Sequence, residues 1–119
     1  NIKIARSNIQ EIIHLPWANY ETLISYMKTS DIFLSTSLYE GYGLSMLEAH
    51  TAGAVLVATD SGIAPLLAME TAKPGDVNSL AKLLSKALSH STMNKFYTYP
   101  YLSKQAYLEA YKGDIERAL

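Results

Sequence analysis

The stretch from Ser35 to Gly53, STSLYEGYGLSMLEAHTAG, constrains the fold of this chain more than any other part of it. A short apolar run at 31–34 precedes it and predicts a buried strand. A glycine turn at Glu40–Gly43 follows, and then the apolar residues of 44–49 recur at helical spacing. A strand that passes through glycines into a helix presents bare backbone N–H groups and the positive end of the helix dipole. We therefore expect an anion-binding site at this turn.

Two carboxylates frame the turn. Glu40 precedes the glycines, and Glu48 lies one turn into the expected helix, where its side chain leans back toward the helix start. Carboxylates are poor ligands for phosphate, but they accept hydrogen bonds from sugar or ribose hydroxyls that lie beside a phosphate. The residues therefore suggest a phosphorylated sugar or a nucleotide sugar as the ligand.

A second apolar run, Ala54–Ala58, follows the expected helix. Two continuous apolar runs separated by a helix are typical of a βαβ unit in a parallel sheet that helices cover on both faces. The fold class is therefore predicted as α/β, with a Rossmann-like parallel sheet flanked by helices. Ligands of such sheets bind beyond the carboxyl ends of the strands. Glu40 and Asp60 both follow such an end, which agrees with the expected anion site.

The segment before this unit predicts a short strand at Ile12–Leu15, stopped by Pro16, with Trp17 packed against the domain. Asn19 is the expected N-cap of a helix. Its core-facing stripe should consist of Leu23, Ile24, Tyr26 and Met27.

The segment after the unit predicts a turn at Pro74–Asp76, with Asp76 as the N-cap of a further helix. One face of that helix carries Val77, Leu80, Leu83, Leu84, Ala87 and Leu88. Residues 92–119 read as helical with a break at Pro100. Their tyrosines are expected to pack a closing helix, although a membrane surface is the alternative; they are Tyr97, Tyr99, Tyr101, Tyr107 and Tyr111.

Composition excludes several classes of protein. The 119 residues allow one domain, and 49% apolar with 18% charged residues indicates a globular chain rather than a disordered one. The net charge of −1 gives no electrostatic basis for nucleic-acid binding. The absence of cysteine excludes disulfides and thiolate metal sites, and no apolar run is as long as a membrane span. We expect a cytoplasmic protein, with a peripheral position on the membrane face as the alternative.

Two glutamates with seven residues between them, including Gly-aromatic-Gly-Leu, resemble the signature of retaining GT-B glycosyltransferases of the glycogen-synthase and mannosyltransferase kind. Flanking segments resemble the same family in the same order over residues 11–90. They are Tyr20–Leu23, Ser30–Leu34, Gly53–Asp60 and the Pro-Gly-Asp turn at Lys73–Asp76. Two positions depart from the family pattern, because Ile63 stands where a second glycine is expected and Leu66 replaces a glutamate.

The resemblance implies roles for the motif residues. Glu40 would hold a hydroxyl of the donor sugar near the reacting carbon, as the catalytic residue, and Glu48 would accept hydrogen bonds from the ribose of the donor nucleotide. Asp60 and Gly62 are further candidates. The loop and helix start would contact the diphosphate and sugar through Gly41, Tyr42, Gly43, Leu44 and Ser45.

The resemblance also implies that residues 1–119 are a truncated C-terminal donor-binding domain, with an N-terminal acceptor domain and the basic diphosphate ligands elsewhere in the protein. The parent would transfer a hexosyl unit with retention of configuration. It would use a nucleotide sugar as donor, with no metal and no separate cofactor, and this piece alone would be inactive. Two alternatives stay open: a nucleotide-sugar epimerase of the same fold, and a non-catalytic nucleotide-sugar-binding module.

Overall fold

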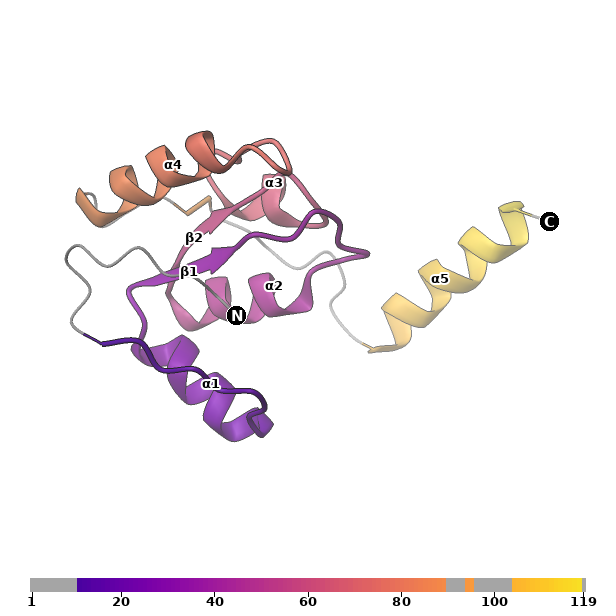
Figure 1. Cartoon of the computed structure of the whole chain (residues 1–119). Helices are drawn as coiled ribbons and strands as arrows, with labels where there is room; N and C mark the ends of the chain where they lie inside the picture. Colours follow the sequence, from indigo (N-terminus) through magenta and orange to yellow (C-terminus); the bar gives the residue numbers. More distant parts are fainter. Residues whose placement is uncertain (1–10, 90–93, 96–103, 119) are drawn as a thin grey trace.

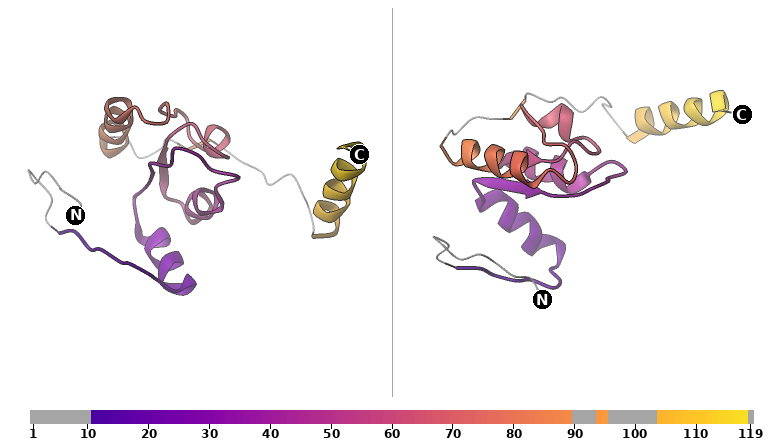
Figure 2. Two further views of the ribbon diagram at one scale, coloured as in Figure 1. Left: turned by 45° about the vertical axis from the view of Figure 1, so that its right-hand side comes forward. Right: turned by 45° about the horizontal axis from the view of Figure 1, so that its top comes forward.

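In the computed structural model, the structure describes residues 11–89, 94–95 and 104–118. Its elements follow one another as α1 (Tyr20–Thr29), β1 (Ile32–Ser35), α2 (Leu44–Ala52), β2 (Val55–Ala58), α3 (Ala64–Leu67), α4 (Val77–Ser89) and α5 (Lys104–Ala118). Figure 1 shows α4 on one side of the two strands and α2 on the other. The two rotated views in Figure 2 keep the same layers.

The centre of the molecule is the parallel pair β1 and β2, joined by α2. The register runs from Ile32 opposite Val55 to Ser35 opposite Ala58. This is the βαβ unit that the sequence predicts, and its α/β class is confirmed. A parallel pair requires a crossover connection, and a helix is the usual one. Both strands therefore direct their carboxyl ends to the same edge of the sheet.

β2 is buried on both faces, as its continuous apolar run predicts. Leu56 and Ala58 pack with Met46 of α2 and with Leu67 of α3 on one face. Val55 and Val57 pack on the other face against α4, through Leu80, Leu83, Leu84 and Ala87. Burial of a Leu or Val side chain contributes roughly 1.5–3 kcal/mol, so this strand is the main anchor of both helical layers.

The outer edge of β2 is covered by two single residues rather than by a strand. Ala72 lies in parallel beside Thr59, and its N–H donates to the Ala58 carbonyl at 3.1 Å. Farther back, the side-chain amide of Asn94 accepts from the Leu56 N–H at 2.8 Å and donates to the Ala54 carbonyl at 2.7 Å. The Asn94 side chain thus makes the two hydrogen bonds to this edge that the backbone of a neighbouring strand would make.

The sequence predicts the helix caps correctly, but it predicts the buried face of each helix only in part. Asn19 accepts from the Thr22 N–H at 2.8 Å and caps α1, as predicted. Of the predicted stripe, Met27 is buried, whereas Leu23 and Tyr26 are exposed. Periodicity marks one side of a helix, but the width of the covered face depends on what packs there, and here α1 meets mainly α2.

α4 shows the same difference between cap and face. The Asp76 carboxylate accepts from the N–H and the hydroxyl of Ser79, so the predicted cap is confirmed. The middle of the predicted face packs on the sheet, but Val77 and Leu88, at the two ends of the helix, are about three-quarters exposed. The helix is 13 residues long and each strand is four, so the helix ends extend past the sheet that would cover them.

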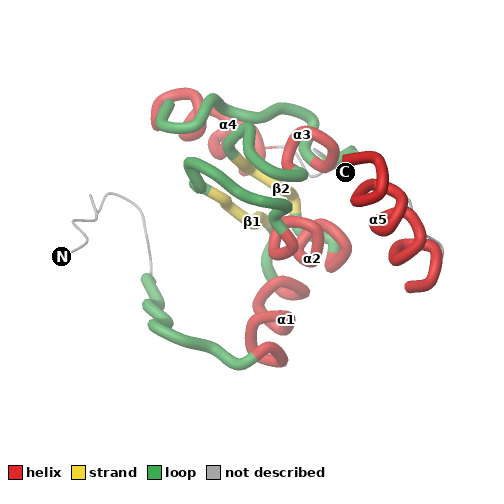
Figure 3. Tube along the Cα trace, turned by 90° about the vertical axis from the view of Figure 1, so that its right-hand side faces the viewer, coloured by secondary structure: helices red, strands yellow, loops and turns green. Residues whose placement is uncertain are grey.

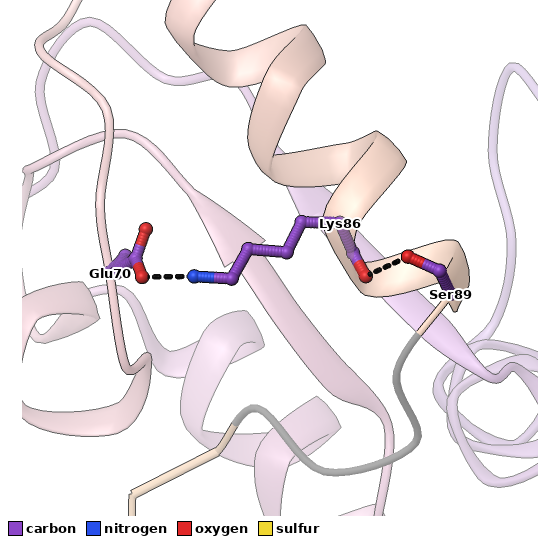
Figure 4. A network of polar contacts seen from close by, with 3 residues as sticks. All are labelled: Glu70, Lys86 and Ser89. Carbon is purple, nitrogen blue, oxygen red and sulfur yellow. Dashed lines mark hydrogen bonds and ion pairs between the residues drawn. The ribbon is translucent and has the colours of Figure 1, made fainter.

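A polar contact outside the core also links α4 to the segment after α3. The Lys86 ammonium pairs with the Glu70 carboxylate, and the Ser89 hydroxyl donates to the Lys86 carbonyl near the end of α4 (Figure 4). Both charged side chains are about half exposed. Exposed ion pairs contribute little to stability, so apolar packing rather than this pair holds α4 on the sheet.

The strand predicted at Ile12–Leu15 is not formed; residues 11–19 have no regular secondary structure. A strand requires a ladder partner, and the sheet of the described residues contains only β1 and β2. Trp17 is 78% exposed, so the expectation that it packs against the domain is also wrong. Without a neighbouring strand, the apolar side chains of this segment have no surface to cover.

α5 forms a separate helix, which Figure 1 shows apart from the layered region. The predicted break at Pro100 lies outside the described residues, as do Tyr97, Tyr99 and Tyr101. Within the ranges that the structure describes, no helix has the length and apolar character needed to cross a membrane.

Candidate functional site

Two loops meet at the carboxyl ends of the strands, the edge that faces the viewer in Figure 3. One follows β1 and spans residues 36–43; the other follows β2 and spans residues 59–63. The Thr59 hydroxyl donates to the Ser37 carbonyl at 2.6 Å, and the Ile63 N–H donates to the Tyr42 carbonyl at 2.7 Å. The loop after β2 therefore holds the loop after β1 at two points.

Gly62 lies where these loops are closest. Its φ of +54° is in the left-handed region, and a Cβ built on it would lie 2.5 Å from the Tyr42 carbonyl oxygen and 2.9 Å from the Glu40 Cβ. Only glycine fits there without moving the backbone. Gly62 thus has a structural reason to be glycine, and it adjoins the residues predicted to contact the donor.

The start of α2 has no side-chain cap. Gly43 is the N-cap residue and has a φ of +91°, and its own carbonyl accepts from the Met46 and Leu47 N–H groups. The N–H groups of Leu44 and Ser45 have no acceptor within the helix, as in the first turn of any helix. Both residues are exposed. The glycine turn therefore leads into the positive end of the helix dipole, where N–H groups without a helical acceptor can bind an anion.

Glu40 lies half-buried at the start of this turn, and its carboxylate is already engaged. The Ser37 hydroxyl donates to Glu40 Oε1 at 2.7 Å. A carboxylate offers about four lone-pair sites, so one donor leaves capacity for further hydroxyl groups. Glu40 can therefore accept from a ligand without giving up Ser37.

Glu48 lies on the second turn of α2 and is bonded to α1 rather than to the loops. The Tyr20 hydroxyl donates to Glu48 Oε1 at 3.2 Å. The negative charge of Glu48 and this hydrogen bond raise the pKa of Tyr20 above its usual value of 10.0. Tyr20 is largely exposed, so a competing hydroxyl can displace it at low cost.

The remaining predicted residues occupy the same edge with different exposure. Asp60 is exposed at the end of β2, and its N–H donates to the Ala72 carbonyl at 2.7 Å. Gly41 and Tyr42 are exposed in the turn, and Gly43 is buried. The structure thus brings the Glu40 turn and Gly62 into contact. Among the described residues, no hydrogen bond links Glu40 to Glu48.

Three contributing side chains were missed by the sequence reasoning: Ser37, Thr59 and Tyr20. Ser37 stands three residues before Glu40, and this spacing of a hydroxyl and a carboxylate is a usable signal for a local hydrogen bond. Thr59 and Tyr20 reach partners 22 and 28 residues away, so neither has a local signal. The described residues also contain no cluster of His, Asp or Glu that could hold a metal ion.

An open groove of ≈ 670 Å³ lies at the opposite end of the sheet, and it is not part of this site. Its lining includes the last residues of three helices, at Thr29, Ala52 and Ser89, together with Asp31. Helix C-termini carry partial negative charge, and the lining also contains Lys28 and Asp31, whose charges are opposite. The three helix C-termini make this groove less favourable for a phosphate than the N-terminus of α2.

The comparisons with known proteins identify the family of the chain. A family model described as "Glycosyl transferases group 1" matches residues 3–105, which include every predicted site residue. No curated protein and no solved structure matches the chain.

Proposed function

The chain belongs to the group 1 glycosyl transferases, and we propose that it is the donor-binding part of an enzyme that transfers a hexosyl unit from a nucleotide sugar to an acceptor with retention of configuration. The start of α2 is the observation that carries this proposal. It follows a parallel strand, begins at a positive-φ glycine and presents the Leu44 and Ser45 N–H groups beside a carboxylate. A diphosphate with a sugar next to it matches both features.

We assign the roles of the two glutamates from the resemblance to the retaining enzymes, and their places around this helix start support the assignment. Glu40 adjoins the glycine turn and accepts a hydroxyl of the donor sugar. Glu48, one turn along α2, accepts the ribose hydroxyls once Tyr20 is displaced. The N–H groups from Tyr42 to Ser45 contact the diphosphate and stabilise the charge that develops on it as the sugar departs. Asp60 and Gly62 line the second loop.

The domain is proposed to work with an acceptor domain, in a cytoplasmic enzyme of the GT-B architecture. The nucleotide sugar enters between the two domains, and no separate cofactor or metal is used. The basic side chains that neutralise the diphosphate would come from outside the loops described above. Without the acceptor domain, this chain would bind the donor but would not transfer the sugar.

Ligand titration of the isotope-labelled chain, followed through its backbone amide NMR signals, tests the binding site. The probes are UDP, GDP and ADP, each with and without an attached glucose or mannose. We expect shifts at the amides of 42–45 and 60–63 with at least one probe. The amides of 75–79 at the start of α4 serve as the internal control. Shifts confined to 75–79, or no shifts with any probe, would refute the proposed site.

Product analysis of the full-length enzyme tests the reaction. With the nucleotide sugar that binds and a simple glycoside acceptor, we expect a new glycosidic bond with the anomeric configuration of the donor. Conversion of the nucleotide sugar into its epimer without acceptor would favour the isomerase alternative. Binding without either product would favour the non-catalytic module.

A further inference from the structure

The geometry of the two loops points to a role that the motif alone does not assign. We propose that Ser37 and Thr59 are positioning residues, which fix the Glu40 carboxylate for the donor sugar through two consecutive hydrogen bonds. This inference rests on the proposed function, since it concerns the residue that would hold the sugar. In this arrangement the end of β2, as well as the loop that contains Glu40, sets the orientation of the Glu40 side chain.

The first link is the bond from the Ser37 hydroxyl to Glu40 Oε1, at 2.7 Å. A glutamate side chain has three rotatable bonds, and fixing it costs conformational entropy. A charged hydrogen bond of good length offsets most of that cost before a ligand arrives. Ser37 therefore orders one carboxylate oxygen and leaves the other for a ligand.

The second link fixes Ser37 itself. Thr59 is 2% exposed, and its hydroxyl donates to the Ser37 carbonyl at 2.6 Å. The Thr59 N–H also donates to the Ser35 carbonyl at 3.2 Å, so the residue continues the ladder between the strands. The buried Thr59 hydroxyl therefore fixes the backbone of Ser37, two residues after β1, relative to the end of β2.

The second loop also limits the other end of the Glu40 side chain. Gly62 lies so near that a Cβ on it would be 2.9 Å from the Glu40 Cβ, and the neighbouring Ile63 N–H holds the Tyr42 carbonyl. The Glu40 carboxylate is thus held by Ser37, and the Glu40 Cβ lies beside Gly62 of the second loop. A preset acceptor gains more in binding a sugar hydroxyl than a mobile one does, because less freedom is lost on binding.

Paired variants separate the effect of losing each hydroxyl group from the effect of changed side-chain packing. Ser37→Ala removes the donor to Glu40, and Ser37→Thr restores a hydroxyl. Thr59→Val keeps the shape and removes the donor, and Thr59→Ser restores it. Thr36→Ala, an exposed hydroxyl in the same loop, is the matched control. If Thr59→Val does not fold, Thr59→Ala removes the same hydroxyl and tests the second bond, and the Ser37 pair tests the first.

The first measurement needs no ligand. The two γ-protons of Glu40 have distinct NMR signals when the side chain keeps one conformation, and the signals merge when it rotates freely. We expect separate signals in the wild type, Ser37→Thr, Thr59→Ser and Thr36→Ala. They should merge in Ser37→Ala and approach each other in Thr59→Val. Separate signals in Ser37→Ala would overturn the inference whatever the chain binds.

The second measurement compares affinity for a nucleotide sugar with affinity for its nucleoside diphosphate, using the pair that binds the wild type. Ser37→Ala should lose about tenfold in affinity for the sugar form and leave the diphosphate unchanged. In a Glu40→Ala background the same substitution should have a much smaller effect, because residue 40 then offers Ser37 no acceptor.

Equal losses for both ligands, or full losses in both backgrounds, would overturn the positioning role while the proposed function stands. If no nucleotide sugar binds the wild type, the proposed function fails and the role falls with it.

Discussion

α2 and α4 begin in similar backbones and satisfy their first turns in different ways. A positive-φ glycine stands at each start, Gly43 with a φ of +91° and Gly75 with a φ of +85°. At α4 the next residue, Asp76, caps the helix with its carboxylate. At α2 the glycine is itself the N-cap, and no side chain satisfies the first turn.

We propose that the difference separates a start that serves the stability of the domain from one that is kept for a ligand. A side-chain cap stabilises a helix, and its omission at an exposed start has a cost that a bound anion can offset. Around Gly75 a Cβ would meet no atom within 4 Å, whereas at Gly43 it would collide with Met46. The start of α2 thus has no side-chain cap, and its N-cap residue Gly43 packs against Met46.

The largest expected effect is that of Gly43→Val compared with Gly75→Val. Both place a β-branched residue at positive φ, which costs about 1–2 kcal/mol or more. Gly43→Val also crowds the buried Met46, and overpacking adds about 1–3 kcal/mol. Thermal melting followed by circular dichroism should show the larger loss of stability at Gly43.

Binding per folded molecule distinguishes a ligand site from a structural turn. Gly75→Val should bind the nucleotide sugar like the wild type, and the folded fraction of Gly43→Val should not. Normal donor affinity in folded Gly43→Val would show that this turn does not approach the phosphate. The contrast between the two helix starts would then concern packing alone.

A second effect concerns the two glutamates near α2, with Glu70 near α4 as the matched exposed control. Glu48→Ala should weaken the binding of nucleoside diphosphate by about 1–3 kcal/mol, the value of a hydrogen bond to a charged group. Glu40→Ala in the full-length enzyme should mainly lower kcat. Glu70→Ala should change neither. Isothermal titration of the diphosphate checks this, and an unchanged affinity in Glu48→Ala would refute the ribose assignment.

A smaller effect is the loss of stability at low pH that comes from Asp76, the N-cap of α4. Hydrogen bonds from the Ser79 side chain and backbone lower the pKa of Asp76 below its usual 3.8. The ionised carboxylate therefore stabilises α4 fully above pH 3.8, and this contribution is lost as the pH falls through the lower pKa of the folded state. Asp76→Asn should flatten that part of the acid-unfolding curve. An unchanged curve would mean that the cap contributes nothing.

The smallest effect concerns Tyr20, whose pKa is raised first by the charge of Glu48 and then by their hydrogen bond. The stabilisation is present below pH 10.0 and is lost as the pH rises through the raised value. Titration of tyrosinate absorbance, with Tyr20→Phe to identify the signal, should show that Glu48→Gln lowers this pKa. A saturating nucleotide should do the same if it displaces Tyr20, and no response to nucleotide would mean that the two residues stay paired.

The elements that local chemistry specifies were predicted well. The apolar runs gave β1 and β2, the glycine turn gave the start of α2, and the caps Asn19 and Asp76 were identified correctly. The strand at Ile12–Leu15 was not formed, because β propensity without a ladder partner does not make a strand. The exposure of Val77 and Leu88 depends on where the sheet ends, and the spacing of apolar residues in the helix does not give that position.

The sequence alone determined the strands and the helix of the βαβ unit, the glycine turn between Glu40 and Glu48, and the caps, because each of these depends on residues that are close together in the chain. Only the tertiary structure decided the long-range contacts around the two carboxylates, which are the Thr59–Ser37 bond and the Tyr20–Glu48 bond. Ser37 and the end of β2 hold Glu40, and an exposed tyrosine from α1 holds Glu48. Side chains that meet across 22 or 28 residues are brought together by the packing of strands and helices, and that packing depends on the whole core at once.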